Sequence, residues 1–322
     1  MPRRPGPPSP VQLDATAPPA VHLAGQHPRT DVERLVRHGT WVRIRHGVYV
    51  DAAWLSDGPD ADRRRALARL EALRRTSPRP PLLLRESAAL AWGLPLVVVP
   101  EVSHTAGRSN PTSHGARDVV RHVVDVPVRH TTEHRGYRVT TLERTAVDCA
   151  TVLHPYAALV VADAALHVGA DRDVMLALLD AARGRRGVRR ARAVLEVADG
   201  GAESPGETWT RWTVLRLGYP VPETQVPVDT GGGRYWADIG YPAWRLLIEY
   251  DGAEKYGTDG RDAVAALRRE RRRQLAVEDA GWRVVRVTAH DRRHVDAFEA
   301  RLRTALPDAP RTARPHLHPP PA

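Results

Sequence analysis

The stretch that decides the C-terminal fold is Trp236-Ala-Asp-Ile-Gly-Tyr241, followed by Arg245-Leu-Leu-Ile-Glu-Tyr-Asp-Gly-Ala-Glu-Lys-Tyr256. Two apolar runs typical of strands carry carboxylates toward their ends, with Asp238 in the first run and Glu249 in the second. A carboxylate in a strand that should bury aliphatic side chains is costly unless a cation compensates it. A metal ion is the usual compensator where several acids converge. We therefore interpret this block as a candidate metal-dependent active site.

Lys255 closes the block and is the only lysine of the chain, because every other residue in the lysine and arginine total of 48 is arginine. Lysine is a compact donor that can shift its pKa, whereas arginine is a fixed fork that stays charged. Lys255 is therefore our candidate for orienting the attacking water or stabilising charge that develops on phosphate. The alternative is a solvated loop residue.

A regular order of elements surrounds this block. Ser204-Pro-Gly-Glu207 predicts the start of a helix, with serine as the N-cap and proline at the first helical position. From there the pattern indicates helix, three strands, helix and strand, an order that can place a mixed sheet between helices. We expect the helices at 204–217 and 261–280, and the strands at 222–228, 234–240, 245–251 and 282–288.

The composition favours a protein that binds nucleic acid. The formal net charge is +10, and a basic balance is the electrostatic footprint of a phosphate-backbone binder. The alternative is that the arginine content reflects genomic coding bias. No apolar run approaches the roughly 20 residues of a membrane helix, no secretory h-region follows the N-terminus, and the single Cys149 excludes a disulfide framework. We therefore expect a cytoplasmic protein with DNA as its partner and no membrane association.

The first ordered region has the pattern of a short helix followed by a basic hairpin. Thr30-Asp-Val-Glu33 has the form of a capping box, and Gly39 is placed to end a helix that runs through His38. The hairpin spans Trp41–Val50, with its turn at His46-Gly47. A helix followed by a basic hairpin is the winged-helix arrangement; the alternative is a small α+β cap with solvated arginines. In the winged-helix interpretation four arginines contact DNA, two from the helix and two from the wing, namely Arg34, Arg37, Arg43 and Arg45.

The chain divides into five regions. The proline-rich ends, residues 1–20 and 307–322, are expected to be disordered because they offer little apolar surface to bury. Between them we expect the winged-helix-like module at 21–55, a mainly helical middle domain at 56–200 and the αβββαβ domain at 201–306. The middle domain is expected to contain helices at 61–76, 85–92, 143–152, 155–168, 171–182 and 187–199, with irregular or strand-like segments at 96–103 and 119–141.

The C-terminal region resembles the PD-(D/E)XK nuclease superfamily, in particular the endonuclease-like domains related to very-short-patch mismatch repair endonucleases. The resemblance covers residues 204–292, little more than a quarter of the chain. It implies a restriction-endonuclease-like fold and hydrolysis of phosphodiester bonds that depends on Mg²⁺ or Mn²⁺. The residues that carry it are Ser204-x-x-Glu207, Asp238, Ile248-Glu-Tyr-Asp-Gly252, Arg271-x-x-x-Leu275 and Gly281-Trp-x-Val-x-Arg286.

The N-terminal part resembles the abortive-infection antitoxin family. Three segments carry this resemblance: residues 30–50, Arg85-Glu-Ser-Ala-Ala-Leu-Ala-Trp-Gly-Leu-Pro95 and Thr141-Leu-Glu-Arg-Thr-Ala-Val-Asp148. Such antitoxins pair a winged helix with a helical region and act as repressors. The segment before residue 30 is short for a full winged helix.

Asp238 and Glu249 are our first choice as metal ligands. Ten residues separate them across a tight connection at Pro242-Ala-Trp244, and an antiparallel pair joined there would make them neighbours. Mg²⁺ commonly takes one or two carboxylates together with water and phosphate oxygens. The superfamily resemblance implies Glu207 as a further ligand from the first helix, whereas its position in a capping box gives it a purely structural role.

The block departs from the superfamily pattern at one position. That pattern has a lysine two residues after the second acid, where this chain has Asp251, and Lys255 follows four residues later. Arg271 lies in the apolar stripe that runs along Val264–Leu275, so we expect it to pair with an acid or to contact phosphate. Gln225 is expected to point into the site from the first strand.

Two function classes follow from these observations. The first is a DNA-binding, metal-dependent endonuclease that acts in defence, repair or mobile-element handling. The second is a non-catalytic transcriptional regulator that resembles a type IV antitoxin and uses a decayed nuclease fold to bind DNA. The oligomeric state stays open, with a homodimer as one alternative.

Overall fold

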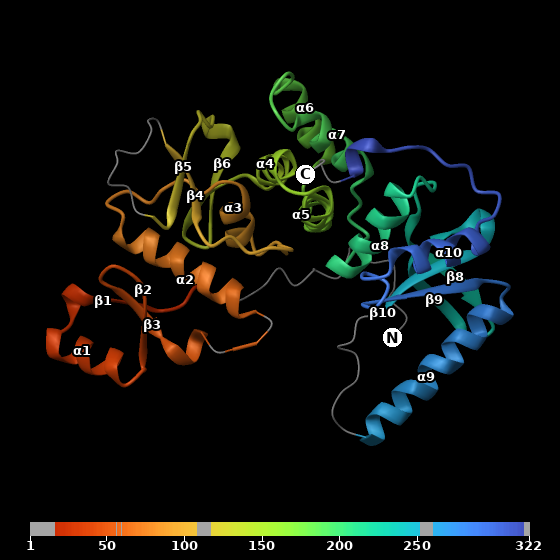
Figure 1. Ribbon diagram of the computed structural model, residues 1–322, viewed down its shortest axis with the longest axis horizontal. Helices are drawn as coiled ribbons and strands as arrows, with labels where there is room; N and C mark the ends of the chain where they lie inside the picture. Colours follow the sequence, from red (N-terminus) through yellow and green to blue (C-terminus); the bar gives the residue numbers. More distant parts are fainter. Residues whose placement is uncertain (1–16, 56, 59, 108–116, 252–259, 319–322) are drawn as a thin grey trace. The chain divides into compact units, whose positions relative to one another are not determined.

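The computed structural model describes residues 17–55, 57–58, 60–107, 117–251 and 260–318. The side chains of residues 260–267 and 269 lie outside the description, and so does Lys255. The chain is of mixed α/β class and forms two compact units (Figure 1). The N-terminal unit comprises the described residues of 12–153 and 170–185, and the C-terminal unit comprises 154–169 and 186–318.

The N-terminal unit begins with a small antiparallel sheet. Its strands lie in the order β1-β3-β2, and β2 and β3 form a hairpin. Gly47 has a φ of +69° in the tight turn, a conformation that favours glycine. The elements of this part are β1 (Val21–Leu23), α1 (Arg29–Arg37), β2 (Trp41–Arg45) and β3 (Val48–Asp51).

Helix α1 ends as the sequence predicts but begins differently. Gly39 follows the helix with a φ of +69°, and its N–H donates to the Val36 carbonyl at 3.0 Å. The N-cap is Pro28, with no side-chain cap, and Thr30 lies inside the helix. The predicted capping box is therefore wrong. Glu33 instead accepts a hydrogen bond of 2.8 Å from Arg29, one turn earlier in the same helix.

The remainder of the N-terminal unit combines helices with two small sheets. Strands β4 and β5 pair in parallel, and β6 and β7 form an antiparallel hairpin. The predicted helices at 61–76 and 85–92 have the observed boundaries, and β5, β6 and β7 lie within the segment expected to be irregular or strand-like at 119–141. The elements are α2 (Ala61–Thr76), α3 (Arg85–Trp92), β4 (Ser103–Gly107), β5 (Val119–Val123), β6 (Thr131–His134), β7 (Tyr137–Thr140), α4 (Leu142–Val152) and α6 (Arg172–Ala181).

The C-terminal unit contains the expected order of helix, three strands, helix and strand. Its sheet has the order β11-β10-β9-β8, in which β8, β9 and β10 are antiparallel neighbours and β11 runs parallel to β10. The elements are α5 (Pro155–His167), α7 (Val188–Val197), α8 (Pro205–Arg216), β8 (Glu223–Thr230), β9 (Gly233–Tyr241), β10 (Leu246–Asp251), α9 (Gly260–Asp279), β11 (Arg283–Thr288) and α10 (Val295–Ala305).

Helices cover both faces of this sheet (Figure 1). On one face, Trp209 of α8 packs against Phe298 of α10 with ring centroids 6.2 Å apart. Gly206 of α8 faces the ring of Tyr250 so closely that a Cβ there would lie 2.1 Å from a ring carbon. On the other face, Val277 of α9 packs in a core cluster with Leu247 of β10. Adjacent residues of β10 therefore face different helices, as the alternation of a strand requires.

Three predicted domain boundaries are wrong. Helices α5 and α7 belong to the C-terminal unit, so the predicted middle domain at 56–200 is divided between the two units. The module predicted at 21–55 shares its unit with α2, because Val50 and Leu55 pack with Ala68 of that helix. The predicted disordered tail at 307–322 is ordered up to residue 318: Leu317 is buried, and its carbonyl accepts a hydrogen bond of 2.9 Å from the Trp212 indole.

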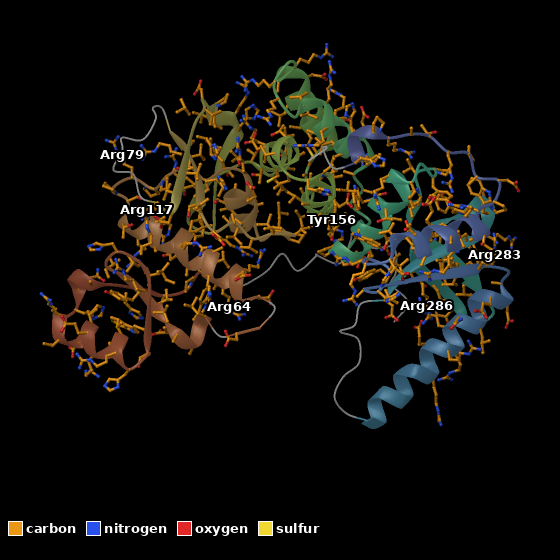
Figure 2. The ribbon with its side chains drawn as sticks, viewed as in Figure 1. Arg64, Arg79, Arg117, Tyr156, Arg283 and Arg286 are labelled. Atoms are coloured by element: carbon orange, nitrogen blue, oxygen red, sulfur yellow. The ribbon has the colours of Figure 1, made fainter. Side chains whose placement is uncertain are left out.

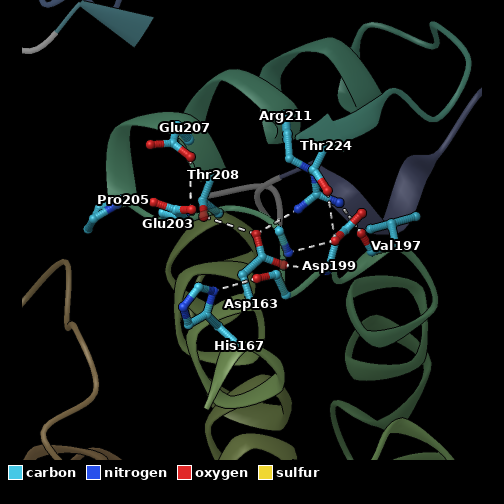
Figure 3. A network of polar contacts seen from close by, with 12 residues as sticks. Asp163, His167, Val197, Asp199, Glu203, Pro205, Glu207, Thr208, Arg211 and Thr224 are labelled. Atoms are coloured by element: carbon cyan, nitrogen blue, oxygen red, sulfur yellow. Dashed lines mark hydrogen bonds and ion pairs between the residues drawn. The ribbon is translucent and has the colours of Figure 1, made fainter. Parts of the chain in front are cut away.

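A buried ion pair explains why α5 belongs to the C-terminal unit (Figure 3). The carboxylate of Asp163 on α5 accepts from Arg211 of α8 at 2.6 Å, and both side chains are fully buried. Thr208 and the Asp199 N–H donate to the same carboxylate, at 2.9 and 2.7 Å. Arg211 also donates to the Val197 carbonyl, at 2.6 Å. We name these five residues the buried network; it joins α5, α7 and α8.

None of the helices in the described ranges is both long enough and apolar enough to cross a membrane.

Candidate active site

The acidic pair lies in the middle of the C-terminal sheet. Strands β9 and β10 pair from Tyr241↔Leu246 to Ile239↔Ile248, and the ladder ends there. The next residue on each strand is Asp238 on β9 and Glu249 on β10. The short connection 242–245, which contains the 3-10 turn Pro242–Trp244, fixes this register, so the two acids are cross-strand neighbours as their spacing predicts.

The two carboxylates influence each other electrostatically. Glu249 is 13% exposed, and burial raises the pKa of its carboxyl group. The nearby negative charges of Asp238 and Glu270 raise the pKa further, whereas the positive charge of Arg273 lowers it. Glu249 therefore has the property expected of an acid that converges with another, since the charge of Asp238 makes its ionisation less favourable.

Two arginines compensate part of this charge. Arg273 of α9 donates to Glu249 at 2.8 Å and to Glu270 at 3.0 and 3.1 Å. Arg286, which is labelled in Figure 2, lies opposite Glu249 in the β10–β11 register and donates to Glu270 at 2.7 Å. With Asp238 these four residues form a group that we name the acid–arginine cluster. Three carboxylates and two guanidiniums give the cluster a net charge of −1.

Arg273 occupies the place that the sequence assigned to Arg271. Arg271 is exposed, and Leu275, expected on the same buried stripe, is 41% exposed. The face of α9 turned to the sheet instead passes through Arg273 and Val277. The prediction failed because five arginines lie between residues 268 and 273, and such a run does not reveal which side of the helix faces the sheet.

Glu207 caps the helix that it begins. Its two carboxylate oxygens accept from the Glu203 N–H at 2.8 Å and the Ser204 hydroxyl at 2.9 Å, and Ser204 in turn accepts from the Glu207 N–H. This is the capping-box role. Helix α8 also covers the face of the sheet that Tyr250 occupies, whereas Glu249 contacts α9 on the other face. The assignment of Glu207 as a metal ligand beside Asp238 stays a prediction, because these bonds show only its capping role.

Gln225 and Asp251 lie on the strands that carry or adjoin the acidic pair, Gln225 on β8 and Asp251 on β10. Gln225 has a φ of +51° on β8 and lies opposite Asp238, between the pairs Thr224↔Ile239 and Val226↔Ala237. Its side-chain amide donates to the Gly201 carbonyl at 3.0 Å, which ties β8 to that segment rather than to an acid. Asp251 is the last residue of β10, half-buried and paired with Thr288 of β11.

The four arginines predicted to contact DNA fall into two groups. Arg45 is only 15% exposed and pairs with Asp118 at 2.8 Å, so its predicted role on the surface of the wing is wrong. Regular alternation would place Arg45 on the same face as exposed Arg43, but the register of β2 against β3 shifts between these two residues. Arg34, Arg37 and Arg43 are exposed, and Arg34 forms an ion pair of 3.2 Å with Asp31 on its own helix.

The acidic pair fits a divalent metal ion. Carboxylate oxygens are the ligands that Mg²⁺ and Mn²⁺ prefer. One oxygen of Glu249 binds Arg273, and the other accepts no hydrogen bond from a residue that the structure describes. Across the same residues, no group of three or more His, Cys, Asp or Glu side chains is arranged to hold a metal. Asp238 and Glu249 would therefore hold the ion together with water and substrate oxygens.

Comparison with known proteins gives relatives without a stated activity. No family model matches the chain, and no solved structure matches it. Two uncharacterized proteins of Mycobacterium tuberculosis, one from strain CDC 1551 / Oshkosh and one from strain ATCC 25618 / H37Rv, are each 34% identical over 170 residues. These residues are 52% of this chain and 61% of each relative. The chain thus spans about three-fifths of the length of the curated relatives that it matches.

Proposed function

We propose that the C-terminal unit is a PD-(D/E)XK-type, restriction-endonuclease-like domain that hydrolyses phosphodiester bonds in DNA with a divalent metal ion. The observation that carries this proposal is the position of Asp238 and Glu249 as neighbours on two central strands of an αβββαβ unit. Two adjacent, partly buried acids have little structural use, because the negative charge of Asp238 raises the pKa of the Glu249 carboxyl group. A cation between them removes that cost.

The residues of the cluster have separate roles in this proposal. Asp238 and Glu249 hold Mg²⁺ or Mn²⁺, which when bound polarises the scissile phosphate and acidifies a water molecule. Arg273 is a positioning residue, because its bond of 2.8 Å fixes the Glu249 carboxylate and its bonds to Glu270 fix Arg273 itself. Exposed Arg268, Arg271 and Arg272 on α9 follow the phosphate backbone. Lys255 stays the candidate for stabilising charge on phosphate.

The experiment is a plasmid-nicking assay on the full chain, with supercoiled, branched and mismatched DNA and with Mg²⁺ or Mn²⁺. We expect Asp238→Asn and Glu249→Gln each to lower the nicking rate by about 100-fold or more, the scale on which removal of a transition-state contact acts. Asp229→Asn is the matched control, because Asp229 is an exposed carboxylate on the same sheet that pairs with Arg234. Cleavage that persists in both active-site variants rejects the assignment.

The second candidate is a non-catalytic regulator that binds DNA. Arg273 already neutralises Glu249, so the acids have a counter-charge without a metal. The N-terminal sheet order β1-β3-β2, with α1 ahead of a basic hairpin, supports winged-helix-like DNA binding through Arg34, Arg37 and Arg43. A wild-type chain that binds DNA tightly and in a salt-sensitive way, yet never cleaves it, would favour this regulator.

A further inference from the structure

A cavity of about 500 Å³ lies in the N-terminal unit, between β2, the short helix Ala52–Leu55 and α2. Its apolar wall includes Ile44 and Leu55. Its polar wall contains three arginines and one acid, namely Arg43, Arg65, Arg69 and Asp57. The volume is within the range of pockets that bind small molecules. None of these residues belongs to the acid–arginine cluster, so this cavity is independent of the proposed nuclease site.

Among the described residues, no carboxylate pairs with the three arginines of the cavity. In the part of the chain that the structure describes, no Asp or Glu oxygen lies within 4.0 Å of the guanidinium nitrogens of Arg43, Arg65 or Arg69. Other described arginines do form such pairs, including Arg45, which binds Asp118 at 2.8 Å. The lining side chains therefore present a net charge of +2 to the cavity.

Arg69 is the most constrained of the three. It is half-buried, and one of its nitrogens donates to the Pro100 carbonyl at 2.9 Å. Burial lowers the pKa of its guanidinium, against the weaker and more distant effects of Glu101, Asp118 and Asp62. Arg65 lies one turn earlier in α2 and faces the same cavity. A half-buried cation without an anion is costly, and a bound anion would remove that cost.

We propose that this cavity binds a small organic phosphate of nucleotide size. Guanidinium groups match phosphate oxygens with paired hydrogen bonds, and a phosphate monoester carries close to two negative charges at neutral pH. These negative charges would balance the net charge of +2 that the lining side chains present to the cavity. Ile44 and Leu55 form an apolar surface for a planar or hydrophobic group. Asp57 can accept a hydrogen bond from a hydroxyl or amino group of the same ligand.

Calorimetric titration of the full chain tests this site with the four ribonucleoside 5′-monophosphates as probes. We expect at least one of them to bind with one site per chain, and its nucleoside to bind at least about tenfold more weakly because the charge-assisted bonds are absent. The double variant Arg65→Gln/Arg69→Gln should lose at least about tenfold in affinity. Arg75→Gln is the control, because Arg75 is an exposed arginine of the same helix outside the cavity.

Three results would overturn the proposal: no binding of any of the four nucleotides, equal binding of nucleotide and nucleoside, or unchanged affinity in the double variant. Arg43→Gln provides a second test if the double variant does not fold, since Arg43 is exposed on β2, and it should also weaken binding. Duplex DNA that displaces the nucleotide and loses affinity in the same variants would identify a backbone contact and reject a small-molecule site. None of these outcomes depends on whether the C-terminal unit cleaves DNA.

Discussion

The buried network and the acid–arginine cluster are built from the same chemical groups in two different ways. In the buried network Asp163 is 1% and Arg211 0% exposed, and backbone and threonine donors satisfy the remaining capacity of the carboxylate. In the acid–arginine cluster Glu249 is 13% and Arg273 29% exposed, and a second acid adjoins the first. In the first arrangement both oxygens of one carboxylate accept hydrogen bonds, whereas in the second the charge of Asp238 adjoins Glu249 and raises the pKa of its carboxyl group. A carboxylate with its acceptors filled favours a structural role, and adjoining carboxylates favour binding of a cation.

The largest effect should follow from breaking the buried network. We expect Arg211→Met to lower the free energy of unfolding of the C-terminal unit by about 3–5 kcal/mol, because the Asp163 charge would stay buried without its partner. Urea unfolding followed by tryptophan fluorescence measures this loss.

The control for this variant is Arg234→Met, because Arg234 binds Asp229 at the same distance of 2.6 Å on an exposed surface. A pair so exposed contributes little to stability. Equal effects of the two substitutions would show that burial does not distinguish the pairs.

A smaller effect should appear in the pH dependence of stability. Burial raises the pKa of Asp163 from 3.8 to about 6, although Arg211 opposes the shift. Between pH 3.8 and about 6, the folded state therefore holds a proton on Asp163 that the unfolded state has released. The stabilisation from this group is fully present below pH 3.8 and is lost as the pH rises through about 6. The expected loss is on the order of 3 kcal/mol.

Unfolding of Asp163→Asn provides the comparison, because asparagine does not titrate. The difference in unfolding free energy between wild type and variant should change between pH 3.8 and about 6 and be constant outside that window. A constant difference across the whole range would contradict the raised pKa.

The smallest effect on stability is expected for Arg273→Met in the acid–arginine cluster. The loss should stay below about 1 kcal/mol, because Arg273 is partly exposed and Glu249 can take up a proton when its partner is gone. The pKa of the Glu249 carboxyl should rise, since the charge of Arg273 holds it down. Carbon-13 NMR of the Glu249 carboxyl measures this change, and exposed Arg272→Met serves as the control.

Local patterns predicted much of the fold. The elements from residue 204 onward were expected within one or two residues of their observed bounds, apart from α10, because Gly, Pro and apolar periodicity mark them within the chain itself. The neighbouring position of Asp238 and Glu249 followed from the same source, since a short connection between antiparallel strands fixes their register.

Contacts between distant segments were not predictable in this way. Asp163 and Arg211 are 48 residues apart, and an acid in the apolar run of α5 indicates that a partner is needed without indicating which one. Arg273 was hidden within a run of arginines, so its pairing with Glu249 depended on a helix rotation that the sequence left open. The tail to residue 318 was expected to be disordered because its proline content, not its single buried Leu317, dominates its composition.

The path of the chain through the two units has a practical consequence for protein engineering. The chain passes from one unit to the other after residues 153, 169 and 185, so α6 belongs to the first unit while α5 and α7 belong to the second. A gene fragment that starts at residue 201 would encode the whole sheet but would leave Arg211 without Asp163. Neither unit can therefore be expressed as one uninterrupted piece, and a circular permutation or an α5–α7 graft would be needed to isolate the second.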